Sequence, residues 1–400
     1  MDKLAIDGGT PVRSSPIHYG RQCIEEDDIQ IVADVLRGEL ITTGPKVELL
    51  EKNLCTLTGA KYAVVVSSGT AALHCACMAL GIKSGDEVIT TPMTLAASAN
   101  CALFCGAKPV FADINPETYN ISPVSIRQHI TEKTKAIIPV DFTGQAVELD
   151  EIQQICKEHK LILIEDAAHA IGTKYKGKPI GSISDMTIFS FHPVKTITGG
   201  EGGAILTNNR EYYEKLLLYR SHAITRDESQ MMHPTHEKWY YEQIDLGYNY
   251  RMTDFQAALI SSQLTKLARF SARRHYIVEK YNAAFSQMPE VTIQKEIPES
   301  DTTRHLYILK LNPEYLNADR REIFDALFAE NIRCNVHYIP VYYHPYYQKL
   351  GYKKGLCPIA EELYENILTL PLYYLMTEED IEDVVIAIKK VIVHYRKNND

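Results

Sequence analysis

The sequence predicts an α/β protein in which a large, mainly parallel sheet is followed by a smaller α+β region. Short apolar runs rich in β-branched residues recur along the chain, and runs with helical spacing separate them. Strands that alternate with helices at short intervals form βαβ units, whose strands pair in parallel. The expected strands of this sheet are 63–66, 87–91, 109–112, 136–140, 161–164, 186–191 and 204–207.

Helical spacing of apolar side chains predicts the remaining elements. In the first part of the chain the expected helices are 25–37, 124–130, 149–159 and 212–220. After a further helix near 265–281 we expect a strand at 305–311 and helices at 320–330 and 380–394. We place the domain boundary in the helix near 265–281. The chain is thus expected to have a large domain over 1–265, with an N-terminal arm, and a small C-terminal domain over 266–400.

Composition favours an enzyme with well-formed cores over a nucleic-acid or membrane protein. The 400 residues carry a formal net charge of −9, whereas nucleic-acid binders are usually basic. No stretch is long and apolar enough to span a membrane, and the N-terminus lacks the apolar run of an export signal. The nine cysteines, an odd number, are typical of reduced thiols. We therefore expect a cytoplasmic protein.

Four of the cysteines raise the alternative of a metal site. Cys75 and Cys77 precede Cys101 and Cys105 by one apparent βα unit. Residues two apart on a helix point to different faces, so Cys75 and Cys77 are poorly spaced as ligands. Small buried helix residues explain them better, and we expect no metal.

The stretch from Leu161 to Asn208 carries the strongest functional signal. Its first apolar run ends at Glu165 and Asp166, and its second is followed by Lys195. Ligands of open α/β sheets bind beyond such strand ends. A lysine amine can form a Schiff base with pyridoxal phosphate, and an Asp can pair with the pyridinium nitrogen. Either residue alone could be an ordinary surface or turn residue; together they favour this cofactor.

A second signal is the turn Ser67-Ser68-Gly69-Thr70 between a strand and a helix. Small residues there expose backbone N–H groups at a helix N-terminus, where they and the helix dipole favour a phosphate. The alternative is a plain helix N-cap.

Three motifs now identify a resemblance. EDAAHAIG at 165–172, SFHPVKTITGGEGG at 190–203 and GYNYRMTDFQAAL at 247–259 resemble those of the DegT/DnrJ/StrS sugar aminotransferases. The resemblance covers nearly the whole chain. It implies the aspartate-aminotransferase fold (fold type I), pyridoxal 5'-phosphate in the large domain, and a homodimer with shared active sites.

The resemblance also assigns roles to residues. Lys195 would hold the cofactor and move a proton, Asp166 would contact the pyridine nitrogen, and His169 would face the ring hydroxyl. The phosphate would be bound by Ser68, Gly69, Thr70 and Ser190, with Asn249 from the other subunit. Many relatives have a ring-stacking aromatic where this chain has Leu95, which can offer only apolar contact.

Substrate contacts are expected at three places by the same resemblance. They are Tyr19, the loop Glu39, Leu40, Ile41 and Thr42, and the run Asn335, Val336, His337 and Tyr338. The loop could equally be an ordinary turn, and the tyrosine-rich run up to Tyr347 could serve domain packing. The polar segment 221–247 could be a mobile lid or a loop that faces another subunit.

The expected activity is transfer of an amino group from glutamate to C4 of a UDP-linked 4-keto-6-deoxy-N-acetylhexosamine, in pseudaminic acid or related surface-sugar synthesis. The alternatives are another nucleotide-linked 3- or 4-keto sugar, dTDP- or GDP-bound, a cofactor-dependent sugar dehydratase, or a non-catalytic sensor. Related dehydratases replace the lysine by histidine, so Lys195 argues against that activity. A sensor would be expected to lose Lys195, Asp166 or the phosphate turn.

Overall fold

A computed structural model describes residues 3–233, 235 and 237–397. Its centre is a seven-stranded sheet with the strand order β2-β10-β9-β6-β5-β3-β4. The strands are β2 (Tyr62–Val66), β3 (Glu87–Thr90), β4 (Lys108–Phe111), β5 (Thr134–Ile138), β6 (Ile162–Asp166), β9 (Met186–Ser190) and β10 (Gly203–Thr207). Every strand predicted for this sheet is present, with ends that differ by one or two residues.

All strand pairs are parallel except those of β10, which runs antiparallel to both β2 and β9. Residues 191–202 link β9 to β10 without a helix, so no crossover returns the chain to the starting edge. The mainly parallel sheet is confirmed, and this short link explains its one reversed strand.

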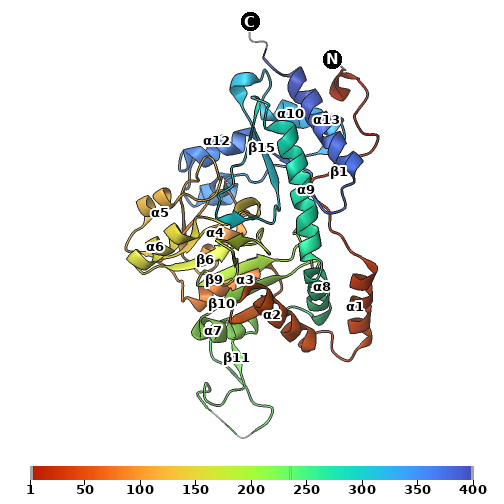
Figure 1. Cartoon of the computed structure of the whole chain (residues 1–400). Coiled ribbons are helices and arrows are strands. Elements are labelled where there is room, and N and C mark those ends of the chain that lie inside the picture. Colours follow the sequence, from red (N-terminus) through yellow and green to blue (C-terminus); the bar gives the residue numbers. More distant parts are fainter. Residues whose placement is uncertain (1–2, 234, 236, 398–400) are drawn as a thin grey trace.

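Helices cover both faces of the sheet (Figure 1). They are α2 (Pro45–Thr58), α3 (Gly69–Ala79), α4 (Ala97–Phe104), α5 (Pro123–His129), α6 (Leu149–His159) and α7 (Arg210–Arg220). One core joins the sheet to Leu50 of α2 and Ile152 of α6, and the other joins it to Leu73 of α3 and Leu216 of α7. The strands are apolar on both faces because both faces are covered.

The C-terminal part is built on α8 (Asp254–Leu264), which packs on the large part with Ala257 and Ile260 in one of its cores, and the long α9 (Leu267–Phe285), which begins the C-terminal part. A small antiparallel sheet has the order β13-β15-β17. These and the other elements are β13 (Val291–Ile293), β14 (Ser300–Asp301), β15 (Tyr307–Leu311), α10 (Arg320–Ala329), β16 (Ile332–Arg333), α11 (Pro345–Lys349), α12 (Pro358–Asn366), β17 (Ile367–Leu370) and α13 (Glu378–His394). Leu4 and Ile17 belong to the core of this part. We keep the division after residue 265, at the break between α8 and α9, as a proposal.

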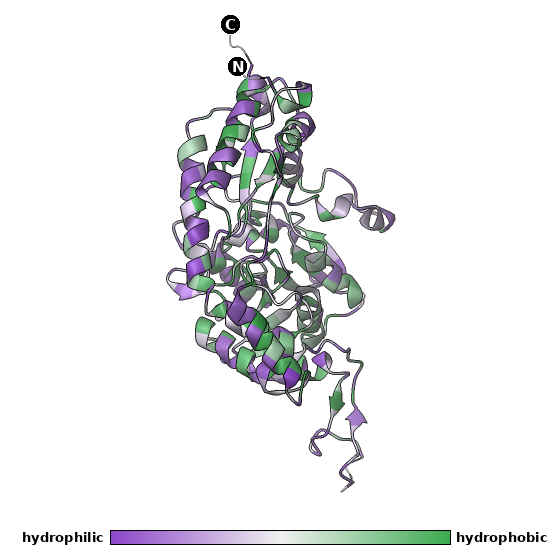
Figure 2. Ribbon diagram, turned by 90° about the vertical axis from the view of Figure 1, so that its right-hand side faces the viewer, coloured by the Kyte–Doolittle hydropathy of each residue, from purple (hydrophilic) through white to green (hydrophobic). Residues whose placement is uncertain are grey.

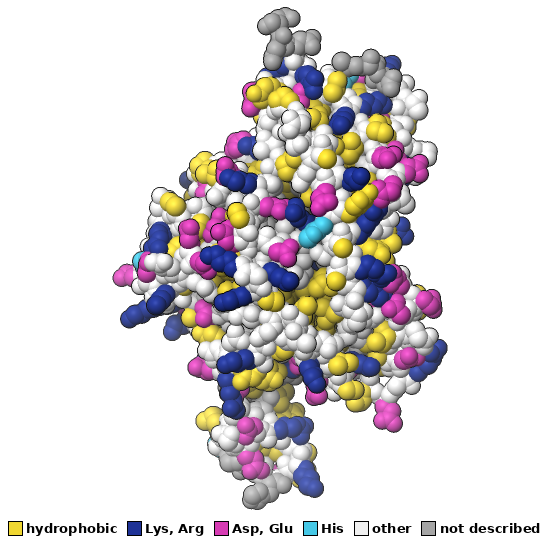
Figure 3. All heavy atoms as spheres, in the orientation of Figure 1, with side chains coloured by type: hydrophobic (Ala, Val, Ile, Leu, Met, Phe, Trp, Pro, Cys, Tyr) yellow, Lys and Arg dark blue, Asp and Glu magenta, His cyan; other side chains and the backbone are white. Residues whose placement is uncertain are grey.

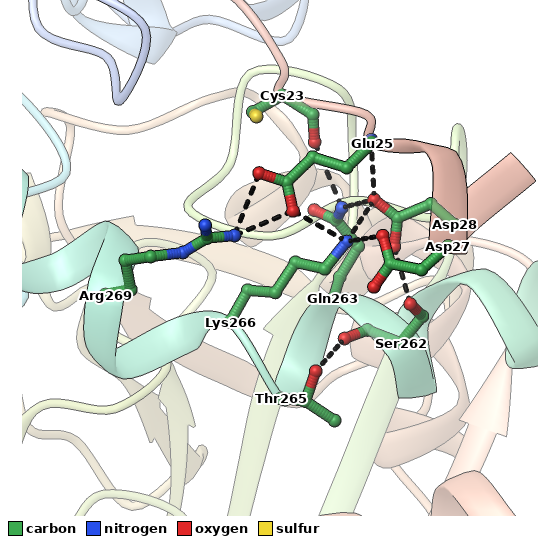
Figure 4. Close-up of polar contacts among 9 residues, drawn as sticks. All are labelled: Cys23, Glu25, Asp27, Asp28, Ser262, Gln263, Thr265, Lys266 and Arg269. Atoms are coloured by element: carbon green, nitrogen blue, oxygen red, sulfur yellow. Dashed lines mark hydrogen bonds and ion pairs between the residues drawn. The ribbon is translucent and has the colours of Figure 1, made fainter.

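The N-terminal segment crosses from the small part to the large one. The 3-10 turn Ala5–Asp7 and β1 (Ile17–His18) precede α1 (Glu26–Arg37), and β1 pairs with β16. Around Lys266, which is 6% exposed, Asp27, Asp28 and Glu25 form ion pairs at 2.6, 2.7 and 3.1 Å (Figure 4). Burial disfavours the charge of Lys266, but the hydrogen bonds to these three acids together raise its pKa. This clamp fixes the start of α1 to the α8–α9 junction.

The described residues among 221–247 form an arm that extends away from the body of the molecule (Figures 1 and 2). Its strands are β11 (Ile224–Thr225) and β12 (Glu242–Gln243), which pair antiparallel. Trp239 on this arm is 70% exposed. Two short strands elsewhere, β7 (Lys174–Tyr175) and β8 (Lys178–Pro179), form a hairpin that β14 extends.

The face drawn in Figure 3 has Lys and Arg side chains scattered among Asp and Glu, with no basic stripe. Within residues 3–233, 235 and 237–397, no helix combines the length and apolarity that crossing a membrane requires.

Candidate active site

A cavity of about 410 Å³ lies at the carboxyl ends of β6 and β9. Most of the cofactor residues predicted from the sequence line it, together with part of the predicted substrate set. The residues from those predictions are Tyr19, Ser68, Gly69, Thr70, Leu95, Asp166, His169, Ser190, Lys195, His337 and Tyr338. Parallel strands end at one edge of a sheet, and this brings residues far apart in the sequence together.

Asp166, the last residue of β6, is almost fully buried in this cavity. Its Oδ2 accepts a hydrogen bond from Ser98 Oγ at 2.7 Å, and its Oδ1 accepts one from the backbone N–H of Ala168 at 3.2 Å. Burial raises the pKa of this carboxyl, while both donors and Lys195 oppose the rise. The site therefore holds an acid that would bind a buried cation strongly.

Sequence reasoning missed Ser98 and Thr94. Thr94 Oγ1 and Ser98 Oγ are 2.8 Å apart. A carboxylate can only accept, so the Ser98 proton points to Asp166 and Thr94 must donate to Ser98. Ser98 lies in the first turn of α4, but Thr94 lies three residues before that helix, so helical spacing gave no signal for this pair.

Lys195 follows β9 in a tight turn, in which its N–H bonds the carbonyl of His192 at 2.9 Å. Its side chain lines the cavity. Burial lowers the pKa of the amine to about 8, although the charge of Asp166 opposes the shift. A lysine with this pKa is partly neutral near physiological pH, as a nucleophilic amine must be.

His169 is held as a neutral imidazole. Its Nε2 lies 3.0 Å from the hydroxyl of Tyr338, and its buried Nδ1 has no hydrogen-bond partner among the described residues. Burial, with the nearby charges of Lys195 and His337, lowers its pKa well below the usual value. Burial also raises the pKa of Tyr338. A buried nitrogen without a hydrogen-bond partner is an atom that a bound ligand can satisfy.

The turn after β2 forms the expected cradle. Ser68 caps α3, since its Oγ accepts from the N–H of Ala71 at 3.1 Å. The N–H groups of Gly69 and Thr70 have no acceptor in the part of the chain that is described. A Cβ on Gly69 would lie 3.1 Å from the Cβ of Ser190. Only glycine lets these donors and the Ser190 hydroxyl surround one small anion.

Two apolar residues, Leu95 and Ile188, line the same cavity. Leu95 is 62% exposed, and Ile188 of β9 is buried. The neighbours of Leu95 in sequence that also line the cavity, Thr94, Ala97 and Ser98, carry no aromatic ring. Leu95 thus forms an apolar wall.

The predicted substrate residues divide between the cavity and other places. The rings of Tyr19 and His337 are 5.2 Å apart, and both residues line the cavity with Tyr338. Asn335 instead bonds Thr369 through its backbone, and Val336 packs against a core.

Tyrosines later in the same run serve packing. Tyr342 and Tyr347 are fully buried in the core beside Phe111. Of the two interpretations of the run, domain packing applies to these rings, whereas Tyr338 faces the cavity.

Asn249 and the loop from Glu39 to Thr42 do not line this cavity. Both are exposed, and Leu40 and Ile41 are among the exposed large apolar residues. Backbone contacts hold their neighbourhoods: Thr42 bridges to Thr253 at the start of α8, and the N–H of Ser67, just after β2, bonds the carbonyl of Tyr250 at 2.8 Å. The roles predicted for these residues stay predictions.

Together these groups fit pyridoxal phosphate. Asp166 suits the pyridine nitrogen, Lys195 suits the aldehyde, the unpaired His169 Nδ1 suits a polar ring substituent, and the Gly69 cradle suits the phosphate. Sequence reasoning did not foresee the other lining residues, which are Leu73, Thr94, Ala97, Ser98, Val140, Ala168, Ile188, His192, Val194 and Glu201.

Comparisons with known proteins agree with this chemistry. The profile of the DegT/DnrJ/EryC1/StrS aminotransferase family matches residues 22–389. The spore coat polysaccharide biosynthesis protein SpsC of Bacillus subtilis is 40% identical over 95% of this chain and 98% of its own. The UDP-4-amino-4,6-dideoxy-N-acetyl-beta-L-altrosamine transaminase of Campylobacter jejuni serotype O:23/36 is 38% identical over 95% of this chain and 99% of its own.

Solved structures give the same result. PseC of Helicobacter pylori, an aminotransferase of pseudaminic acid biosynthesis, has a TM-score of 0.88 at 30% identity and covers 95% of this chain and 100% of its own. Spr1654 of Streptococcus pneumoniae in its PLP form has a TM-score of 0.88 at 32% identity, over 95% and 99% of the two chains. The protein is a sugar aminotransferase that uses pyridoxal phosphate, and the chain belongs to the DegT/DnrJ/EryC1/StrS aminotransferase family.

Proposed function

We propose that the protein transfers an amino group from glutamate to C4 of a UDP-linked 4-keto-6-deoxy-N-acetylhexosamine, in pseudaminic acid or related surface-sugar synthesis. The observation that carries this proposal is the full-length similarity to the C. jejuni transaminase, with that of H. pylori PseC beside it. The cavity supports it, because Tyr19, His337 and Tyr338 place rings where a sugar face could stack.

Different residues of this chain would bind different parts of the cofactor. When bound, pyridoxal phosphate supplies the electron sink for moving the amino group. Asp166, held by Ser98 and Ala168, would keep the pyridine nitrogen protonated. Lys195, whose pKa of about 8 allows the free amine, would hold the cofactor and carry a proton between donor carbon and cofactor. The N–H groups of Gly69 and Thr70 would bind the phosphate.

His169 and Tyr338 would set the orientation of the ring. Tyr338 lies 3.0 Å from His169 Nε2, so Nδ1 is the ring nitrogen left without a partner among the described residues. The neutral imidazole adds no charge beside Lys195, so burial, opposed by the charge of Asp166, accounts for the lowered pKa of the amine.

We also propose a homodimer with shared active sites. Asn249 is exposed and lies outside the cavity of its own chain, so a phosphate contact from it would have to reach another subunit. The projecting arm with its exposed Trp239 and Leu246 offers apolar area for such contact. A cytoplasmic location stays a prediction beside this one.

The activity is tested by a two-step absorbance experiment. The purified protein is loaded with pyridoxal phosphate, and glutamate is added. Conversion of the cofactor to its amine form is expected, and the UDP-linked 4-keto sugar should reverse it faster than dTDP- or GDP-linked analogues. Lys195→Ala is the control and should show neither change. Reversal only by a dTDP- or GDP-linked sugar would overturn the proposed substrate but leave the aminotransferase intact.

The shared site is tested by mixing subunits. Lys195→Ala and Asn249→Ala are purified separately, then unfolded and refolded together. In a mixed dimer one site has both lesions and the other has none, so about a quarter of all sites should regain activity. Sedimentation confirms the dimer. No recovery in a dimer of proven mixed composition would show that Asn249 acts within its own chain, and full activity of Asn249→Ala by itself would show that it has no role.

A further inference from the structure

Behind Asp166, on the other face of the sheet, two acids are buried together. Asp141 follows β5 and Glu165 is the neighbour of Asp166 in β6; both side chains are fully buried. Successive residues of a strand point to opposite faces, so Glu165 points away from the cavity. The two carboxyl groups lie within hydrogen-bonding reach of each other.

The hydrogen bonds around the pair locate a proton. Glu165 Oε2 accepts from Ser184 Oγ at 2.9 Å and from Thr187 Oγ1 at 3.0 Å. Asp141 Oδ1 accepts from the N–H of Val147 at 3.0 Å. The remaining oxygens, Asp141 Oδ2 and Glu165 Oε1, are buried and have no other donor among the described residues. If both carboxyl groups were ionised, these two oxygens would have no donor and the two negative charges would repel each other. One proton shared between the two oxygens gives each a hydrogen-bond partner.

Glu165 already accepts hydrogen bonds from two hydroxyl groups, and these stabilise its ionised form. The shared proton therefore belongs mainly to Asp141. The directions of the pKa shifts agree. Burial and then the charge of Glu165 raise the pKa of Asp141 well above its usual value, with Asp166 adding to the rise. Burial also raises the pKa of Glu165, opposed by Ser184, Thr187 and Asp141.

The pair is joined to the active site through the backbone. The N–H of Asp141 bonds the carbonyl of Asp166 at 3.1 Å, and the N–H of Asp166 bonds the carbonyl of Pro139 at 2.9 Å. Val140, between them, lines the cavity. The side-chain contact thus locks the ends of β5 and β6 together directly beneath the carboxylate that meets the cofactor.

We propose that Asp141 and Glu165 share one proton and, through it, act as positioning residues that fix Asp166 for the cofactor. Neither acid touches the cavity. The contact between the two acids requires the proton. It therefore fixes the position of Asp166 over the pH range in which Asp141 stays protonated.

The test compares Asp141→Asn with Asp141→Leu. Asn keeps a donor for Glu165 and an acceptor for Val147, so it should bind pyridoxal phosphate within about twofold of the wild type. Leu has a similar size but removes both, so its dissociation constant for the cofactor should rise about tenfold or more. Circular dichroism of both variants verifies that the fold is kept, and the measurement needs no keto sugar.

A second measurement looks for the proton itself in the cofactor-free protein. Infrared spectra at neutral pH should show the C=O stretch of a protonated carboxylic acid in the wild type, and Asp141→Asn should lose it. The wild type should also lose thermal stability as pH rises through the raised pKa of Asp141, because the folded state holds a proton that the unfolded state releases. Asp141→Asn should lack that part of the decline.

Equal cofactor affinity in the Asn and Leu variants would overturn the positioning role. An infrared band that persists in Asp141→Asn, or a pH profile that this substitution does not change, would overturn the shared proton. A failure of the sugar assay would leave both measurements unaffected, so the two proposals are separable.

Discussion

Removing one hydroxyl, in Ser98→Ala, tests the account of Asp166 most directly. The Ser98 hydroxyl donates to Oδ2 at 2.7 Å, and the N–H of Ala168 at 3.2 Å is the other donor that we find on this carboxylate. The substitution leaves the Asp166 side chain buried but removes the shorter of its two hydrogen bonds. The anion then loses stability, whereas the protonated acid loses little.

The size of the effect follows from this contact. A hydrogen bond to a charged group contributes about 1.5–3 kcal/mol, and each pKa unit corresponds to about 1.4 kcal/mol. The pKa of Asp166, already raised by burial, should therefore rise by about one to two further units. The carboxylate strengthens cofactor binding without being indispensable for it, so affinity is highest above this pKa and declines in part as pH drops through it. Ser98→Ala should move that fall upward by the same one to two pH units.

The assay is a spectral titration of pyridoxal phosphate binding at a series of pH values. Thr94→Val is the matched control, since it removes the group that donates to Ser98 while Ser98 still donates to Asp166. It should shift the midpoint by less than Ser98→Ala. If cofactor affinity falls at the same pH in Ser98→Ala as in the wild type, the reasoning is refuted.

Three further predictions concern other groups. In the cofactor-free protein an amine-selective reagent should modify Lys195 faster as pH rises through about 8, where the amine becomes neutral; peptide mapping follows it, and a rise centred near the usual lysine pKa would contradict the burial argument. Asp166→Asn should retain the cofactor but strongly slow the glutamate half-reaction in single-turnover kinetics; rates near the wild type would show that the acid is dispensable. Lys266→Met should destabilise the fold by about 3 kcal/mol, the low end for a broken buried ion pair, because Asp28 keeps its bonds to Ser262 and Gln263. Urea denaturation measures this loss against Lys295→Met, whose exposed pair with Glu117 should contribute under about 1 kcal/mol.

The sequence predicted the sheet well because its strands are buried on both faces. The run 63–66 is apolar throughout and 186–191 is mostly apolar, and apolar runs are the pattern that sequence reading detects. The site residues at strand ends, Asp166 and Lys195, could be found for the same reason. The reversal of β10 depended on a helix that is missing from 191–202, and an absence is a weak signal.

Other features could not be read because they depend on partners distant in the chain. Asn335 is a polar residue that could bind a substrate, but its backbone pairs with Thr369 of β17 at the edge of the small sheet. Ser98 looks like any helix serine until β6 places Asp166 beside it. The pair of Asp141 and Glu165 is likewise visible only after β5 and β6 lie side by side. A local pattern cannot contain such contacts.

The segment around Asn249, which stays outside the cavity, is held in place by backbone contacts. The segment of Asn249 is pinned on both sides: Tyr248 accepts from the N–H of His222 at 2.8 Å, and Tyr250 accepts from that of Ser67 at 2.8 Å. The Tyr250 hydroxyl adds a third contact, at 3.0 Å from His74 Nδ1. Backbone held this firmly costs conformational entropy, yet the Asn249 side chain it carries is exposed. A chain that orders a polar group and leaves it facing outward is prepared for a ligand or a second molecule, and this supports a site completed by another subunit.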